Sequence, residues 1–94
     1  MKSTGTIQAG TGIWYDPNTG ATNESGFTGL PGGDRNGNDG SFYYLGFGGN
    51  FWSSSQEGTG AAWIRYLEFS NAIVGRDGGS KEYGFSVRCL QDYP

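Results

Sequence analysis

The side chains best able to do covalent or acid–base chemistry are scarce in this 94-residue sequence, which has one cysteine and no histidine. Cys89 would need surroundings that favour its thiolate before it could act as a nucleophile. It shares one side of an alternating stretch with Val87 and precedes Leu90, a pattern typical of a small buried hydrophobe. We therefore interpret Cys89 as a structural core residue.

Carboxylates could support two further kinds of site, a glycosidase acid pair and a calcium-binding loop. Glu57 and Glu68 could form the acid pair of a glycosidase, but nothing in the sequence brings them together. The stretch from Asp34 to Asp39 (DRNGND) is similar to part of a calcium loop, but it lacks the terminal glutamate and contains Arg35. We interpret this stretch as a solvated turn. We expect no metal, no cofactor and no enzymatic activity.

Charge and hydropathy restrict the class of partner. The formal net charge is −3, and no basic cluster could neutralise several phosphates, so we expect no nucleic-acid partner. No apolar run is long enough for insertion into a membrane, and residues 1–5 do not resemble a signal peptide. Any export signal is therefore expected to lie outside this sequence.

Short strands and tight turns dominate the predicted structure. Nineteen glycines disfavour helices, whereas three Trp, six Tyr and six Phe can build a small core. We expect a single partial domain over residues 1–94, with a polar N-terminal segment (1–23) and a β-rich body (24–92). The fold class is mainly β, with short antiparallel strands and long Gly-rich loops. Strands are expected at 41–47, 50–55, 61–70, 71–76 and 83–89, with a bend at Gly48-Gly49 and a turn at 77–80.

The clearest strand covers residues 61–70. Alternation places Trp63 and Leu67 on one face and Ile64 and Tyr66 on the other. We predict that the first pair points into the core. Large side chains on both faces are unusual for a strand with one dry side, so we predict that Ile64 and Tyr66 face outward and take part in binding. The other predicted core residues are Trp52, Phe85 and Val87, together with Phe51 and Phe69.

Several groups of residues occur in an order and at distances that resemble one family. They are residues 21–27 (ATNESGF) leading to 30–33 (LPGG), then 51–54 (FWSS), then 84–90 (GFSVRCL). Each is a weak signal alone, but the ordered set closely resembles the C-terminal half of the Fibrobacter succinogenes major paralogous domain. The resemblance extends from Lys2 to Asp92.

This resemblance implies a fold related to C-type lectins and to formylglycine-generating enzymes, in which a helical half packs against a β-rich half. The helical portion is missing here, so we expect the sequence to be partial. An uncovered apolar face tends to associate, and we therefore expect self-association or a partner that supplies the missing layer. The family also implies an extracellular or cell-surface bacterial protein. A fold-level likeness to an enzyme transfers no activity.

Tyrosines interleaved with Gly, Ser and Asp are typical of an antibody-like binding surface. Some proteins resembling this family are varied by diversity-generating retroelements, which convert asparagine codons into Tyr, Phe, Ser, Gly, Asp or Ile. Glu68 and Glu82 do not fit that pattern, and ordinary divergence between paralogues is the alternative.

We predict a non-catalytic recognition module that binds a protein or carbohydrate surface ligand. The alternative is a structural packing module with no ligand of its own. The candidate ligand-binding residues are Tyr43, Tyr44, Phe47, Ile64, Tyr66, Ile73, Asp77 and Tyr83.

Overall fold

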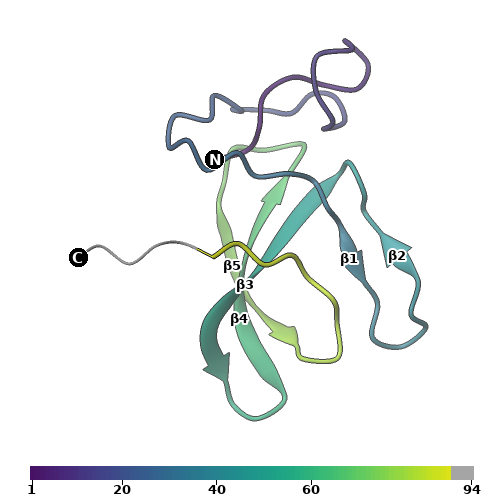
Figure 1. Cartoon of the computed structure of the whole chain (residues 1–94), viewed down its shortest axis with the longest axis vertical. Helices are drawn as coiled ribbons and strands as arrows, with labels where there is room; N and C mark the ends of the chain where they lie inside the picture. Colours follow the sequence, from purple (N-terminus) through teal and green to yellow (C-terminus); the bar gives the residue numbers. More distant parts are fainter. Residues whose placement is uncertain (90–94) are drawn as a thin grey trace.

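A computed structural model of the chain describes residues 1–89 and confirms a mainly β fold with antiparallel strand pairing. Five strands follow one another along the chain (Figure 1): β1 (Asp34–Arg35), β2 (Phe42–Tyr43), β3 (Gly48–Glu57), β4 (Ala61–Glu68) and β5 (Gly75–Ser80). The last three form a sheet in the order β3-β4-β5, and β1 and β2 form a separate hairpin beside it. Leu90, and the predicted β-rich body from residue 90 to 92, lie outside the described residues.

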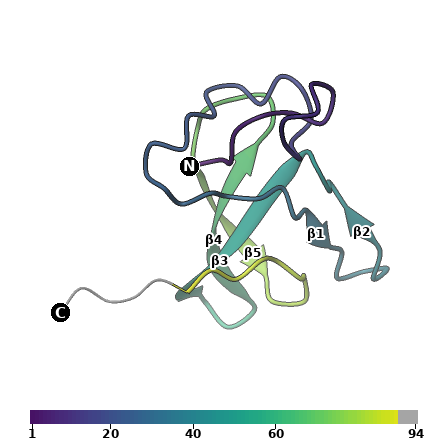
Figure 2. The same cartoon turned by 45° about the horizontal axis from the view of Figure 1, so that its top comes forward.

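The N-terminal residues form loops without regular strands. These loops gather at the end of the sheet where β3 begins and β4 ends, as Figures 1 and 2 both show. Within residues 1–89, no helix has the length and apolar character needed to cross a membrane.

The predicted strand at 61–70 is confirmed as β4, but the predicted bend at Gly48-Gly49 is wrong. Both glycines belong to β3, and the chain reverses earlier, where Tyr44 and Gly46 have φ values of 66° and 86°. The reason is close backbone approach. A Cβ on Gly49 would lie 2.5 Å from the carbonyl oxygen of Leu30, so a glycine is required there for packing and not for a turn.

The predicted turn at 77–80 and the predicted strand at 71–76 are also wrong, because β5 spans Gly75–Ser80. Glycines enter this strand because aromatic rings lie against them. A Cβ on Gly75 would collide with the ring of Tyr66, and one on Gly79 would lie 2.6 Å from Cε2 of Phe85. A ring that covers a glycine restores the packing that a strand glycine lacks.

Residues 83–89, predicted as a regular strand, make only two isolated bridges. Gly84 pairs with Arg35 of β1, and Ser86 pairs in parallel with Phe51 of β3. The segment therefore links the hairpin to the free edge of the sheet. After Ser86 the described residues form no further bridge, and Val87 is 67% exposed. The prediction that Val87 belongs to the core is wrong for that reason.

The main core joins the sheet to the N-terminal loops. Trp14 is completely buried against Phe51 and Leu67, with Phe27 and Phe69 packed around them. Phe51 and Leu67 are therefore core residues, as predicted. Trp14 lies in the segment that composition marks as polar, and its indole Nε1 donates hydrogen bonds to Ser3 Oγ and to the Gly29 carbonyl, both at 3.1 Å.

A smaller cluster forms on the opposite face of β4. Ile64 is only 6% exposed there, and Trp52 packs on Phe85 with ring centroids 4.6 Å apart. The prediction that Ile64 faces outward is wrong, because residues 83–86 cover this part of the face. Trp63 is not a core residue either. It is half-buried at the sheet surface, where the guanidinium of Arg76 lies 3.9 Å from its ring centroid.

Lys2 ties the N-terminal loops to the sheet. Its side chain is 3% exposed, and Nζ donates hydrogen bonds to the carbonyls of Thr19 (2.7 Å), Glu68 (2.8 Å) and Asn71 (2.8 Å). Burial lowers the pKa of this ammonium group. The three carbonyls replace the water that the charge has lost, and the charge in turn satisfies three backbone acceptors, one in the N-terminal loops and two at the end of β4 and just after it.

Replacing Lys2 with methionine removes these donors while keeping a side chain of similar length. We expect Lys2→Met to lower the free energy of unfolding by roughly 2–4 kcal/mol, because each buried acceptor left unpaired costs roughly 1–3 kcal/mol. Urea denaturation measures the change. Lys81→Met is the control, since Lys81 is exposed. Equal stability of the two variants would contradict the anchoring role of Lys2.

Candidate functional site

Three of the predicted ligand-binding residues meet in one hollow of about 370 Å³, which we call the aromatic hollow. It lies between the β1–β2 hairpin and the face of β3 and β4 opposite the main core. Tyr44, Phe47 and Tyr66 all line it. The other lining residues were not among the predicted ligand-binding residues; they are Asp34, Gly48, Asn50, Glu68 and Phe69.

The floor of the aromatic hollow follows from strand register. Asn50 of β3 pairs with Tyr66 of β4, and Gly48 pairs with Glu68, so alternation places these residues on one face. A Cβ on Gly48 would make only ordinary contacts, 3.7 Å from the Leu67 carbonyl oxygen and 3.9 Å from Cβ of Tyr44. The floor is therefore open at Gly48 because the residue there has no side chain.

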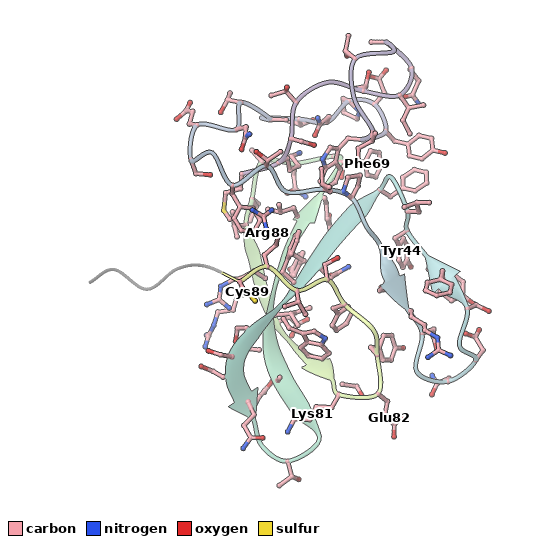
Figure 3. All side chains as sticks on the ribbon, viewed as in Figure 1. Tyr44, Phe69, Lys81, Glu82, Arg88 and Cys89 are labelled. Atoms are coloured by element: carbon pink, nitrogen blue, oxygen red, sulfur yellow. The ribbon has the colours of Figure 1, made fainter. Side chains whose placement is uncertain are left out.

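Aromatic stacking fixes one wall of the aromatic hollow. The ring of Phe47 stacks on Tyr15 at 4.1 Å between centroids, and it meets Phe69 edge to face at 5.2 Å. The other wall is Tyr44, which is 63% exposed. Figure 3 labels Tyr44 on the hairpin side and Phe69 near the end of β4. One wall is thus held by packing, and the other stands in solvent.

A second hollow of about 220 Å³ adjoins the first and shares Asp34 and Tyr44 with it. Tyr43 and Tyr83, both predicted site residues, line this second hollow with Asn36. The Asn36 side-chain amide donates a hydrogen bond to the hydroxyl oxygen of Tyr83 at 3.2 Å. Five of the eight predicted residues therefore border one continuous depression.

Two carboxylates belong to the aromatic hollow. Asp34 is half-buried, and burial raises the pKa of its carboxyl group. Among the described residues, no group donates a hydrogen bond to the Asp34 carboxylate. Glu68 accepts one from the side-chain amide of Asn71 at 3.1 Å. Across residues 1–89, His, Cys, Asp and Glu side chains form no group of three able to hold a metal ion.

The remaining predicted site residues lie elsewhere. Ile64 shares the face of Tyr66 but is buried under the residue 83–86 segment. Ile73 is 70% exposed in the loop before β5, and Asp77 is exposed on β5, where its carboxylate accepts a hydrogen bond from the Gly78 amide at 2.8 Å. Strand register, which pairs Asn50 with Tyr66, would have located Asn50 and Glu68. No sequence signal pointed to Asp34.

Of the stretch from Asp34 to Asp39, interpreted as a solvated turn, the first two residues are strand β1, and residues 37–39 form the hairpin turn. Its side-chain oxygens serve the turn itself, since Asn36 accepts a hydrogen bond from the Asn38 amide and Asp39 accepts one from the Ser41 amide, both at 2.8 Å. The hydroxyl of Tyr43 also donates to the Asp39 carboxylate at 2.7 Å. Such bonds are the usual stabilisers of Asx turns.

The residues considered for catalysis are not assembled. Cys89 is exposed, so its interpretation as a core residue is wrong. It lies three residues past Ser86, which makes the last bridge to the sheet among the described residues. Glu57 pairs with Ala61 at the far end of β4 from Glu68. That separates the two glutamates by about 23 Å along the strand, far beyond the distance of less than about 10 Å in a glycosidase pair.

The hydrogen bond between Tyr43 and Asp39 shifts the pKa values of the two side chains in opposite directions. The hydroxyl holds the pKa of Asp39 below its ordinary value, and the carboxylate raises the pKa of Tyr43. We expect Tyr43→Phe to raise the pKa of Asp39 toward that of a free aspartate, and Tyr44→Phe, which keeps the bond, to leave it unchanged. Carboxyl ¹³C NMR titration measures this pKa.

The same bond gives the hairpin a pH dependence. A lowered carboxyl pKa contributes stability above the ordinary aspartate pKa, and this is lost as pH falls through the lowered value. A raised tyrosine pKa contributes stability below the ordinary tyrosine pKa, and this is lost as pH rises through the raised value. Identical Asp39 titrations in both phenylalanine variants would rule out the bond in solution.

Comparison with protein families gives one match, to the Fibrobacter succinogenes major domain, over residues 1–91. The chain therefore belongs to this family, as the ordered residue groups predicted. Comparison with curated proteins and with solved structures gives no match. The relation to C-type lectins, retroelement diversification and self-association stay predictions.

Proposed function

We propose that this member of the Fibrobacter succinogenes major domain family is a non-catalytic recognition module of an exported or surface-displayed bacterial protein. Its ligand-binding surface is the aromatic hollow together with the adjoining tyrosine-lined depression. The ligand is a group on the surface of a protein or a carbohydrate. The chemistry of the site, and not the fold, supports this proposal.

The observation that carries it is the concentration of aromatic side chains in a solvent-open hollow of a chain with so small a core. Tyr44, Phe47 and Tyr66 come from a turn and a strand, and they converge with Asn50 between them. A concave, mainly apolar surface with a few polar groups is the usual form of a ligand site. Tyrosine also gives large contact area with little loss of side-chain freedom on binding.

The catalytic alternative has little support from the geometry. Cys89 is exposed and the sequence has no histidine to act as its base, and Glu57 and Glu68 lie at opposite ends of the β3–β4 hairpin. A binding role needs neither group.

The packing alternative has one observation in its favour. A separate apolar hollow of about 450 Å³ lies between the N-terminal loops and the turn before β3, and includes the exposed side chains of Ile7, Ile13, Leu30 and Leu45. A structural module that packs against a neighbour would use such a surface and would leave the aromatic hollow unused. The two functions therefore make different predictions for a change confined to the aromatic hollow.

Gly48→Val provides that change. The added methyl groups would occupy the floor beside Tyr44, while the Cβ makes only ordinary contacts. Valine also suits a strand better than glycine does. We expect the free energy of unfolding to stay within about 1 kcal/mol of the unmodified chain or to rise. Gly60→Val is the matched control, because a Cβ there meets nothing within 4 Å.

Binding is measured on a printed glycan array and with a displayed peptide library. For each selected ligand, we expect Gly48→Val to weaken binding at least about tenfold, a loss of about 1.4 kcal/mol, and Gly60→Val to have no effect. Ligands that bind both variants equally would exclude the aromatic hollow as the site. Absence of any ligand would favour the packing module.

A further inference from the structure

We propose that the aromatic hollow binds a cationic organic group, namely the guanidinium or ammonium group of an arginine or lysine side chain in a partner polypeptide. This inference rests on the proposed function and names the chemistry of its ligand. It comes from three features of the hollow: its aromatic faces, its unpaired carboxylate, and the lack of any basic side chain among the residues that line it.

The aromatic faces form the first feature. Four aromatic rings line the hollow, contributed by Tyr44, Phe47, Tyr66 and Phe69. A cation within about 6 Å of such a face is attracted by the negative charge of the ring face, and several rings around one group form a cage for ammonium or guanidinium ions. Tyr66 and Phe69 come from consecutive parts of the chain, and the other two from the turn before β3, so the rings surround the hollow from two sides.

The chain's own basic residues behave in the same way where they can reach a ring. Arg76 lies over Trp63 at 3.9 Å, Arg88 over Phe27 at 4.5 Å, and Lys2 lies 5.5 Å from the Trp14 ring. None of the lysines or arginines in the described part of the chain lines the aromatic hollow. No described basic side chain therefore competes with an external cation for the ring surface that faces the hollow.

The carboxylates form the second feature. Asp34 is half-buried beside Tyr44, and no described group donates a hydrogen bond to its oxygens. A carboxylate held partly away from water is stabilised by an opposite charge. Glu68 lies across the floor from Gly48 and retains oxygen lone pairs beyond the single hydrogen bond from Asn71. A guanidinium or ammonium group between the rings would find acceptors on both sides.

The net charge of the chain also favours a basic partner. With a net charge of −3, the chain attracts basic partners over longer distances than a neutral chain would. A neutral sugar could also stack on tyrosine rings, but it would leave the charge of Asp34 without a counterion. The hollow is therefore better matched to a basic peptide segment than to a neutral glycan.

The test compares two peptides that differ only in charge. Acetyl-Gly-Arg-Gly-amide is titrated into the ¹⁵N-labelled chain, alongside the same peptide with citrulline, the neutral isostere of arginine. The amide signals of Asn50, Tyr66 and Glu68 report on the floor of the hollow. We expect the arginine peptide to shift these signals and to bind at least about tenfold more tightly than the citrulline peptide, a difference of about 1.4 kcal/mol.

Two aspartate variants locate the charge that is recognised. Asp34→Asn should remove most of the preference for arginine over citrulline. Asp77→Asn removes the same charge from an exposed site on β5, outside the hollow, and should leave that preference intact. An equal effect of the two variants would show general attraction by net charge and would overturn the inference.

The outcomes separate this inference from the proposed function. Equal binding of the arginine and citrulline peptides would overturn the cation preference but leave a binding hollow. If cellotetraose shifted the three amide signals and the arginine peptide did not, the cation preference would likewise be overturned, and the hollow would still be a binding site. Absence of shifts with the arginine peptide also overturns the inference. The proposed function itself fails if ligands of the chain bind the Gly48→Val variant undiminished, or if neither the glycan array nor the peptide library yields a ligand.

Discussion

One backbone carbonyl of the N-terminal loops and two from the end of β4 and the residues just after it converge on the single ammonium group of Lys2, and the arrangement of the N-terminal loops depends on that convergence. A loop that packs over a sheet brings its peptide groups away from water, and each needs a partner. Here a charged side chain supplies three hydrogen bonds at once. The isolated bridge between Lys2 and Gly29 then holds the first residues against the loop that precedes β1, and Trp14 packs between these loops and the sheet.

Glycines in the strands let aromatic rings and neighbouring backbone pack closely against this small sheet. The ring of Tyr66 lies against Gly75, the ring of Phe85 against Gly79, and the backbone of Leu30 against Gly49. At each place a side chain would occupy the volume that a ring or a peptide now fills. The chain therefore builds two layers around its three-stranded sheet from few large residues, and the glycines make that possible by allowing close approach.

The aromatic hollow is a consequence of partial coverage. Residues 83–86 cross one end of a β4 face and bury Ile64, whereas the other end of that same face, with Tyr66 and Glu68, stays open beside the β1–β2 hairpin. Phe47 holds one side of the opening because its ring is fixed between Tyr15 and Phe69. The same strand face thus supplies core at one end and a surface for recognition at the other.

The sequence alone determined the fold class, the strand that became β4, the inward position of Leu67, the hairpin turn at residues 37–39 and the family. Each of these depends on local chemistry or on ordered residue groups, and alternation within one strand is a local property. The convergence of Tyr44, Phe47 and Tyr66 could be anticipated only as a list of aromatic residues, without their shared location.

Tertiary structure decided what covers each face. Alternation states which residues share a side of a strand, but the side becomes core only where another segment packs on it. That is why Ile64 is buried while Trp63 stays at the surface, and why Val87 and Cys89 are exposed beyond the last bridge to the sheet. Asp34 lies in the site for the same reason, because its short hairpin packs beside a sheet whose first strand begins at Gly48.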